Sequence, residues 1–237
     1  MALRLPCRVR EVIAHGDHVY SVLLEPRRQV PRFLPGQFLH LALDPYRPGD
    51  FWPDSRVFSI ASSPADTSLL RIAYAVKGSF TSRMEQELQA GGDIWVKLPY
   101  GEFVVAEDQD VCLLAGGTGV TAFTAFLSSR QAALTRDIYI IYGARRPELL
   151  IYRSLVEEAA KRCPRVHAHL FSEQLTEEDS GLERGSIDLE CVFRLIGCPP
   201  ASLAYYIAGP PGMIRDLSTD LRSRAIPDRC IFVDAWE

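Results

Sequence analysis

The sequence has no long hydrophobic run. None of its apolar stretches approaches the ~18 residues that a membrane-spanning helix needs. The opening residues, Met1 to Arg8, also lack the apolar segment of a secretory signal. These absences predict a soluble, cytoplasmic protein with no membrane insertion.

The sequence also lacks an excess of positive charge and any cysteine spacing typical of a metal centre. Its 26 Lys and Arg stand against 30 Asp and Glu, a net charge of −4. Nucleic-acid binding usually needs a basic face, so nucleic acid is not expected as a partner. The six cysteines are too far apart for a zinc ribbon or a plant-type iron–sulfur site, and we expect mostly buried, reduced thiols. No histidine has a carboxylate or cysteine at ligand spacing beside it, so we expect no metal site.

The remaining composition, 47% hydrophobic and 24% charged, is that of an ordinary globular protein. A chain of 237 residues is about one and a half times the ~150 residues of a typical domain. One large domain or two small ones is therefore expected.

The first half of the chain is a series of short extended runs. They are rich in Val, Ile, Leu and aromatic residues, and most are bounded by Gly, Pro, Asp or Ser; they cover 7–14, 18–25, 38–43, 56–61, 69–75 and 93–97. One helical stretch, 81–90, interrupts them. Six strands with a single helix predict a small antiparallel β-barrel.

The second half alternates buried runs with helical segments. Strands are expected at 111–115, 137–142, 166–171, 203–208 and 230–233, and helices at 120–130, 147–162, 188–196 and 212–224. This alternation predicts βαβ units and a parallel sheet with both faces covered. The boundary between the halves is expected near residues 105–110.

Two glycine-containing turns follow buried runs of the second half. Gly116-Gly117-Thr118-Gly119 comes before a helix, where glycines would let the backbone approach a phosphate and the helix would offer unpaired N–H groups. The alternative is a tight strand-to-helix turn, and the spacing is not that of the dinucleotide fingerprint. Gly209-Pro210-Pro211-Gly212 ends another run, although proline also commonly begins helices for structural reasons alone. Two strand ends at one sheet edge would be able to hold one ligand between them.

Two segments of the first half also combine residue types that suit binding. Arg56 and Phe58 share one face of a strand, with Ser59 on the other, yet arginine and serine on strands are usually solvated. Residues Gly78 to Thr81 stand at a helix start, where they form either an N-cap or an anion site.

Taken together, these motifs resemble those of the ferredoxin–NADP reductase superfamily, and the resemblance covers nearly the whole chain. They occur in the order of that family: Pro35-Gly36-Gln37-Phe38, Arg56-Val57-Phe58-Ser59, Gly78-Ser79-Phe80-Thr81, Gly116-Gly117-Thr118-Gly119, Gly209-Pro210-Pro211-Gly212-Met213 and Asp234-Ala235-Trp236. The sequence is most similar to bacterial NAD(P)H–flavin reductases and to oxygenase reductases without a fused iron–sulfur domain. The resemblance implies an FAD-binding β-barrel domain at 1–106 and a Rossmann-like NAD(P)-binding α/β domain at 107–237.

The resemblance also implies roles around a flavin. Arg56 would pair with the flavin phosphates, Phe58 would lie against the ring or ribityl chain, and Ser59 would place its hydroxyl near the hydride-accepting N5. Further roles fall to residues that would hold the phosphates (Gly78, Ser79, Phe80, Thr81) or line the ribityl or adenine side (Ile72, Tyr74). Trp236 would stack where the nicotinamide must arrive, and Asp234 would support Ser59. Ser59, Asp234 and Trp236 are the implied catalytic residues. Phe58 replaces the commoner tyrosine, which removes one hydrogen bond to the flavin.

On the nucleotide side, the resemblance implies contacts from both glycine turns: Gly117, Thr118, Gly119, Gly209, Pro210 and Met213. Ala208 stands where many members carry a cysteine. Ser172-Glu173 falls where members that prefer NADP have Ser-Arg. A carboxylate at Glu173 would repel a 2′-phosphate and would accept hydrogen bonds from a free ribose hydroxyl, which favours NADH, whereas Arg145 and Arg184 favour NADPH. The alternative for Glu173 is a solvated residue in the acidic loop 173–178.

Three functions are consistent with these residues. The first is an NAD(P)H-dependent flavoprotein reductase that passes hydride to FAD and then electrons to a separate iron–sulfur or haem protein, such as a ferredoxin-type or oxygenase component. The second is an NAD(P)H:flavin oxidoreductase that reduces free flavin. The third is a non-catalytic electron-transfer or regulatory subunit of a larger complex.

Overall fold

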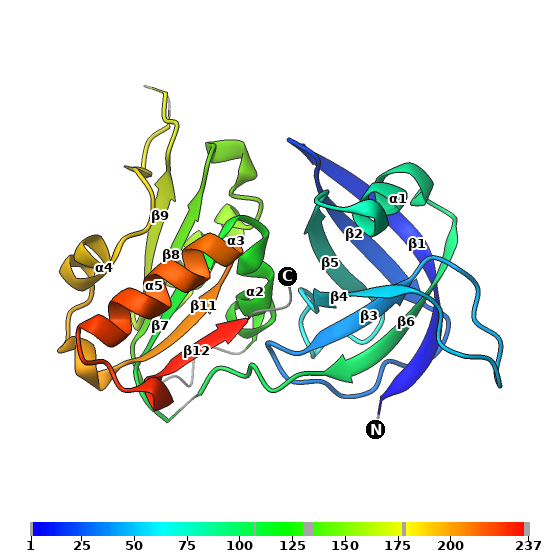
Figure 1. Cartoon of the computed structure of the whole chain (residues 1–237), viewed down its shortest axis with the longest axis horizontal. Coiled ribbons are helices and arrows are strands. Elements are labelled where there is room, and N and C mark those ends of the chain that lie inside the picture. Colours follow the sequence, from blue (N-terminus) through cyan, green and yellow to red (C-terminus); the bar gives the residue numbers. More distant parts are fainter. Residues whose placement is uncertain (1, 107, 130–134, 177–178, 235–237) are drawn as a thin grey trace. The chain divides into compact units, whose positions relative to one another are not determined.

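The computed structural model describes the chain except residues 1, 107, 130–134, 177–178 and 235–237. The chain divides into two compact units, each described by itself below (Figure 1). The first unit comprises Met1–Val104 and Thr121–Ser129, and the second comprises Val105–Val120 and Arg130–Glu237.

The first unit is built on a six-stranded antiparallel sheet. In chain order its strands are β1 (Leu3–Gly16), β2 (Val19–Pro26), β3 (Phe38–Ala42), β4 (Ser55–Ser59), β5 (Leu70–Ala75) and β6 (Asp93–Tyr100). They are arranged in the order β4-β3-β6-β1-β2-β5. The N–H of Ala61, just after β4, donates to the carbonyl of Arg71 on β5 at 2.8 Å, so the two edge strands meet and the barrel nearly closes. The predicted antiparallel barrel is confirmed.

Alternation of side chains explains the core of this barrel. On β1, Leu5, Cys7 and Val9 are buried, whereas Arg4, Arg8 and Arg10 on the alternate positions are exposed, as expected when successive residues point to opposite faces of a sheet. The helix α1 (Ser79–Glu87) adds Phe80 and Met84 to the same core. The helix α2 (Thr121–Ser128) also belongs to this unit, where Phe123 lies 5.9 Å from Phe103 between ring centroids.

The second unit contains a six-stranded parallel sheet. Its strands are β7 (Val111–Gly116), β8 (Ile138–Ala144), β9 (Val166–Ser172), β10 (Glu183–Arg184), β11 (Ala204–Ala208) and β12 (Ile231–Asp234), in the order β10-β9-β8-β7-β11-β12. Strands β7 and β11 are buried along their whole length, as strands covered on both faces should be. The predicted parallel α/β sheet is confirmed.

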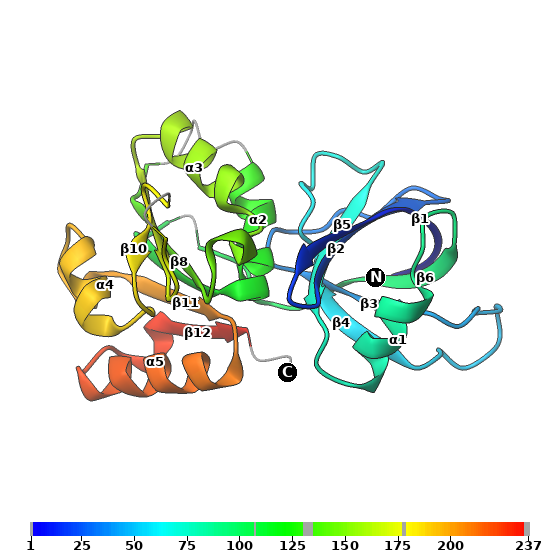
Figure 2. The same ribbon diagram turned by 90° about the horizontal axis from the view of Figure 1, so that it is seen from above.

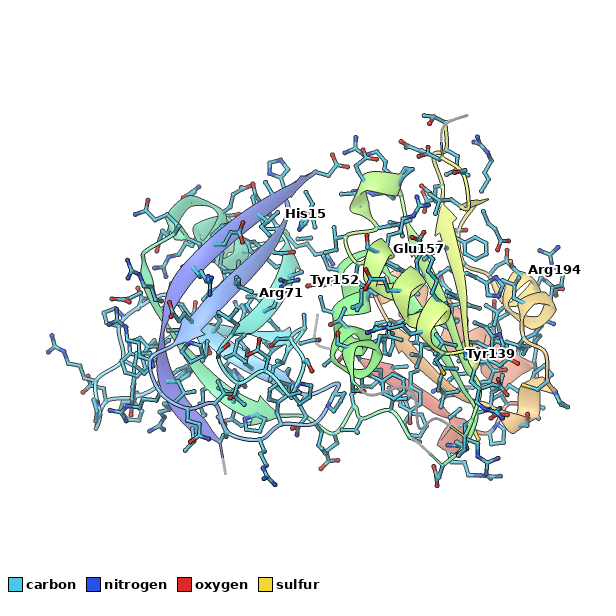
Figure 3. The ribbon with its side chains drawn as sticks, turned by 180° about the vertical axis from the view of Figure 1, so that it is seen from behind. His15, Arg71, Tyr139, Tyr152, Glu157 and Arg194 are labelled. Atoms are coloured by element: carbon cyan, nitrogen blue, oxygen red, sulfur yellow. The ribbon has the colours of Figure 1, made fainter. Side chains whose placement is uncertain are left out.

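Helices cover both faces of this sheet. The helix α3 (Arg153–Arg162) lies on one face, and α4 (Leu189–Leu195) and α5 (Pro211–Ser223) lie on the other (Figure 2). Tyr139 of β8 is buried in the core that α4 and α5 share, whereas Arg194 projects from α4 into solvent (Figure 3). Every helix among the described residues is too short or too polar to cross a lipid bilayer.

Three local features differ from the sequence-based expectation. The segment 147–162 is not one helix, because Pro147–Leu149 forms a 3-10 turn and α3 begins only at Arg153. Another 3-10 turn, Gly117–Val120, precedes α2. The two-residue strand β10 lies in a segment for which no strand was expected, since its two exposed charged residues carry no hydrophobic alternation.

Candidate functional site

Strand β4 presents two different faces. Phe58 is paired with the fully buried Leu39 of β3 and packs partly against the barrel core. Ser59 is paired with Phe38 and is half-buried. Arg56 and Phe58 therefore point to one side of the sheet, and Ser59 points to the other.

The structure brings Arg56 to the first turn of α1. The Arg56 guanidinium carbon lies 5.3 Å from the centroid of the Phe80 ring. Its Nη1 donates to the Ser55 carbonyl at 3.0 Å and to Asp54 Oδ1 at 3.2 Å, and the side chain remains exposed. A fork-shaped cation beside a helix N-terminus is an arrangement that attracts phosphate oxygens.

The turn that starts α1 is open to an approaching group. Gly78 is the N-cap residue, and a Cβ placed on it would meet no atom within 4 Å. The Thr81 hydroxyl accepts hydrogen bonds from the N–H groups of Lys77 (2.9 Å) and Gly78 (3.1 Å), so this side chain shapes the turn. Ser79 is exposed. The first N–H groups of a helix have no acceptor within the helix, so this turn fits an anionic phosphate.

Tyr74 on β5 carries a buried polar atom without a partner. Its ring centroid lies 5.4 Å from that of Tyr20, in a stack, and 6.2 Å from that of Phe58, edge-on. The hydroxyl is buried and has no hydrogen-bond partner among the described residues. Burial raises the pKa of this phenol. An orphaned hydroxyl beside Phe58, four residues before Gly78, fits the polar groups of a flavin ribityl chain. Ile72 itself is fully buried in the barrel core.

A polar cluster that sequence reasoning missed supports this region. Tyr20 donates to Glu85 Oε1 of α1 at 2.7 Å, and His18 Nδ1 lies 2.7 Å from the same oxygen. The hydrogen bond to Glu85 raises the pKa of His18, and the hydrogen bonds from His18 and Tyr20 lower the pKa of Glu85. The cluster ties α1 to the β1–β2 hairpin and, through the stacked ring of Tyr20, to Tyr74. Glu85 lies 65 residues from Tyr20, so no local pattern predicts their contact.

In the second unit, the two glycine turns lie at the ends of neighbouring strands. Ala115 of β7 and Ala208 of β11 are paired in register, so both turns leave the same edge of the sheet. A Cβ on Gly119 would overlap the backbone of Ala208, and a Cβ on Gly209 would lie 3.0 Å from Gly116 Cα. The turns therefore pack backbone against backbone.

The other residues predicted for this edge lie around the same turns. Gly117 has a φ of +52° and nothing within 4 Å of an added Cβ, so the backbone is open there. Met213 of α5 packs over Gly116, Pro210 caps α5, and Thr118 is half-buried in the 3-10 turn. Glycines that expose backbone at the carboxyl ends of parallel strands are typical of a site for a dinucleotide.

The residues predicted to discriminate between nucleotides also meet at this carboxyl edge. Ala144 of β8, Ser172 of β9 and Arg184 of β10 are paired in register. Glu173 and Arg145, which follow Ser172 and Ala144, are exposed. The buried Ser172 hydroxyl lies 3.3 Å from the Arg145 carbonyl and 3.1 Å from the Gln174 carbonyl. Its proton is therefore donated within the turn.

The C-terminal pair of predicted residues is described only in part. Asp234, the last residue of β12, is paired in register with Ala208 and is half-buried. Trp236 lies outside the described residues. Ser59 belongs to the first unit and Asp234 to the second.

Metal-binding groups do not gather in the described part of the chain. No group of three or more His, Cys, Asp or Glu side chains there is arranged to hold a metal ion. All six cysteines are unpaired; Cys7, Cys112, Cys163 and Cys191 are buried, and the other two are half-buried.

Comparisons with known proteins give a consistent picture. A family profile described as "Oxidoreductase NAD-binding domain" matches residues 113–219. An NAD(P)H-flavin reductase of Aliivibrio fischeri is 31% identical over 189 residues, which cover 74% of this chain and 73% of the relative. A flavohemoprotein of Bacillus subtilis (strain 168) is 29% identical over 207 residues, 84% of this chain and 51% of the relative, so the chain spans about half of that protein. The crystal structure of the Amycolatopsis cytochrome P450 reductase GcoB superposes with a TM-score of 0.82 at 20% identity, over 99% of this chain and 70% of that one.

Proposed function

Because the chain belongs to the ferredoxin–NADP reductase superfamily of NAD(P)H-dependent oxidoreductases, we propose that it transfers hydride from NAD(P)H to bound FAD and electrons to a separate redox protein. The proposed acceptor is an iron–sulfur or haem protein. The flavohemoprotein relative, whose name joins flavin and haem, supports a haem acceptor.

The observation that carries this proposal is the convergence of Arg56 with the N-terminus of α1. The guanidinium over the Phe80 ring and the open turn at Gly78 come from segments that are distant in sequence. A barrel has no need of an exposed arginine over an aromatic ring at a helix N-terminus for its own stability. Both groups favour negative charge, so together they would hold the pyrophosphate of FAD.

Bound FAD would accept a hydride from NAD(P)H and release its electrons singly, and the chain's own residues would bind and orient it. Phe58 would pack against the flavin, and the Tyr74 hydroxyl would donate to a ribityl oxygen. Ser59 would hydrogen-bond at the position that accepts hydride, with Asp234 and Trp236 as the other proposed catalytic residues. Reacting atoms must come within ~3–3.5 Å, so the main task of these residues is positioning.

The glycine turns of the second unit would receive the nicotinamide nucleotide. Gly117, Thr118 and Gly119 would offer backbone and hydroxyl donors, and Gly209, Pro210 and Met213 would line the neighbouring strand end. This role is supported by the backbone packing between the turns, which leaves Gly117 open to a ligand.

NADH is the proposed reductant. Glu173 is exposed at the carboxyl edge, where its carboxylate would accept hydrogen bonds from a ribose diol and repel a 2′-phosphate. Arg184 donates to the Leu175 carbonyl at 3.0 Å, which occupies part of its guanidinium. Arg145 is the remaining cation that would favour NADPH.

Spectroscopy of the purified protein tests the proposal. We expect a flavin absorption band that survives gel filtration and that NADH bleaches anaerobically, with NADPH bleaching it more slowly. Arg56→Gln should weaken FAD binding about 10- to 100-fold, because a hydrogen bond to a charged group contributes ~1.5–3 kcal/mol. Arg47→Gln, which removes an exposed arginine from the preceding loop, is the matched control. Equal FAD affinity in the two variants would contradict the proposed role of Arg56.

A second candidate is an NAD(P)H:flavin oxidoreductase that releases reduced flavin. The relative named NAD(P)H-flavin reductase supports it, as does Phe58 in place of a tyrosine that would add a hydrogen bond to the flavin. Loss of all flavin on gel filtration, with turnover only when free flavin is added, would favour this candidate. If the protein neither binds flavin nor oxidises NAD(P)H, the remaining candidate is a non-catalytic subunit of a larger complex.

A further inference from the structure

A row of basic side chains crosses three neighbouring strands of the barrel. Arg4 of β1 is paired directly with Lys97 of β6, and Lys97 is paired with His40 of β3. Residues paired in this way lie on the same face, with Cβ atoms about 4.5–5.5 Å apart, and like charges so placed destabilise a sheet. Among the described residues, neither Arg4 nor Lys97 forms an ion pair with a carboxylate. The fold therefore places the two cations Arg4 and Lys97 side by side on this face, next to His40, whose pKa is lowered by burial and by Lys97.

Aromatic rings surround the two cations. The Arg4 guanidinium carbon lies 5.0 Å from the centroid of the Tyr46 ring, and its Nη1 donates to the Tyr46 hydroxyl at 2.8 Å. Lys97 Nζ lies 5.1 Å from the centroid of Tyr100 and 5.9 Å from that of Trp52. The π faces of these rings attract the cations and hold them in place without neutralising their charge.

The loop between β3 and β4 completes this arrangement. It turns back over the strands so that the Tyr46 ring centroid lies 5.4 Å from those of Trp52 and Trp95. Trp52 is fixed by a hydrogen bond from its Nε1 to Ser55 Oγ at 3.0 Å. Tyr46, Trp52 and Trp95 together form an aromatic wall. Tyr46 is only 6% exposed, so its ring is packed tightly within this wall.

A cavity opens beside this wall. It has a volume of about 360 Å³ and is lined by Ala2, Leu3, Arg4, Tyr46 and Lys97. The cavity is a hollow largely open to solvent, with a volume at the lower end of the ~300–1,000 Å³ that small-molecule sites occupy. The cavity belongs wholly to the first unit.

We propose that this cavity binds a small organic anion that carries an aromatic ring. The anionic group would lie between Arg4 and Lys97. The ligand ring would contact the half-buried Trp52, whose ring centroid lies 5.9 Å from Lys97 Nζ, because Tyr46 itself is almost fully covered. Oxygens of a carboxylate would supply the negative charge that the row lacks, and an aromatic ring would match the wall. The site shares a face of the sheet with Ser59, because His40 is paired with Val57 of β4, and it lies opposite the face of Arg56 and Phe58.

Ligand binding to the unmodified protein tests the proposal without depending on how any variant folds. The probes are benzoate, cyclohexanecarboxylate and inorganic phosphate, added to FAD-saturated, untagged protein, because Ala2 and Leu3 line the cavity. Two of the chain's three tryptophans, Trp52 and Trp95, lie at the wall, so tryptophan fluorescence is the readout. We expect saturable quenching by benzoate, with an affinity about tenfold higher than that of cyclohexanecarboxylate or phosphate, from the ring contact. Absence of saturation at millimolar benzoate, or equal affinity for the three probes, would overturn the proposal.

Variants then locate the site. Arg4→Gln and Lys97→Gln should each abolish the benzoate quenching and the rise in thermal midpoint that benzoate produces. Arg10→Gln, on the same strand β1 and exposed, is the matched control and should retain both. Circular dichroism checks that the variants are folded. If the Arg4 and Lys97 variants keep both the quenching and the rise in thermal midpoint, benzoate binds elsewhere and the proposed site is refuted.

Discussion

At the scale of single residues, Tyr74 links the stability of the barrel to ligand binding. Its hydroxyl is buried without a partner, whereas that of its stacked neighbour Tyr20 donates to Glu85. A buried unpaired hydroxyl costs about 1–3 kcal/mol of stability. The Tyr74 hydroxyl therefore lowers the stability of the free protein, and it would add to the affinity for a ligand that supplies an acceptor.

Tyr74→Phe should therefore have opposite effects in the two states. Without flavin, the thermal midpoint of the variant should equal or exceed that of the unmodified protein, because an unsatisfied polar atom is removed. With FAD, affinity should fall roughly 2- to 10-fold, the equivalent of a hydrogen bond of ~0.5–1.5 kcal/mol. Thermal unfolding with and without FAD measures both. Tyr20→Phe is the control and should lower stability in both states; a Tyr74→Phe variant that does the same would contradict this account.

Glu173 is the residue on which the preference for NADH depends. Replacing it with arginine should raise kcat/KM for NADPH relative to NADH by about tenfold or more, because a charge-assisted bond to the 2′-phosphate replaces repulsion. Steady-state kinetics with both nucleotides measure the change. Gln174→Arg introduces the same charge one residue later and should leave the preference nearly unchanged. An equal change in both variants would indicate a general electrostatic effect and not a contact of residue 173.

At the scale of elements, the glycine turns show that close packing can impose the same residue as ligand binding. Gly119 is required because β11 runs against it, and Gly117 because its φ is positive. We expect Gly119→Ala to destabilise the protein by about 1–3 kcal/mol, since the new methyl group meets backbone that cannot move aside. Gly116→Ala should cost less, because the added Cβ meets side chains, among them the flexible Met213. Chemical denaturation measures the free energy of unfolding of both variants. A larger loss of stability for Gly116→Ala than for Gly119→Ala would contradict this explanation.

The attachment of α1 to the β1–β2 hairpin should depend on pH. The pKa of His18 is raised by Glu85, so the stabilisation it contributes is complete below the ordinary histidine value and is lost as the pH rises through the raised one. The pKa of Glu85 is lowered, so its contribution is lost only in acid. The midpoint difference between the unmodified protein and His18→Gln should therefore be small but larger at pH 5.5 than at pH 8.5.

His15 provides a control of opposite sign for this pH dependence. Burial lowers the pKa of His15, so its contribution is lost as the pH falls. The midpoint difference between the unmodified protein and His15→Gln should therefore grow as the pH rises. Parallel slopes for the two variants would contradict the opposite pKa shifts of His18 and His15.

The same elements show which parts of the molecule the sequence was able to predict. The strands of both sheets were predictable from their hydrophobic patterns. Apolar residues alternate with polar ones in β1, which is buried on one face, and form continuous runs in β7 and β11, which are buried on both. Strand β10 was not, because its two exposed residues pair only through backbone. Glu85 and the row of Arg4, Lys97 and His40 were missed because sheet register brings them together, and register is not a local property of the sequence.

At the scale of the whole molecule, the two leading functions differ in whether the flavin leaves the protein. A flavin held by Arg56, the α1 N-terminus and Tyr74 would stay bound while electrons pass to an acceptor. Its relatives include an NAD(P)H-flavin reductase, of which the chain covers 73%, and a flavohemoprotein, of which it covers about half.

We expect the flavin to be retained, and turnover kinetics provide the test. With NADH and a one-electron acceptor such as ferricyanide, the rate of the FAD-loaded protein should not change when free FAD is added, because no flavin has to be exchanged in each cycle. The rate of Arg56→Gln should instead rise and saturate with free FAD, since its weaker site must be refilled. If the rate of the unmodified protein instead rises and saturates with free flavin, flavin is a substrate. Reduced flavin would then leave the protein and carry the electrons to the acceptor.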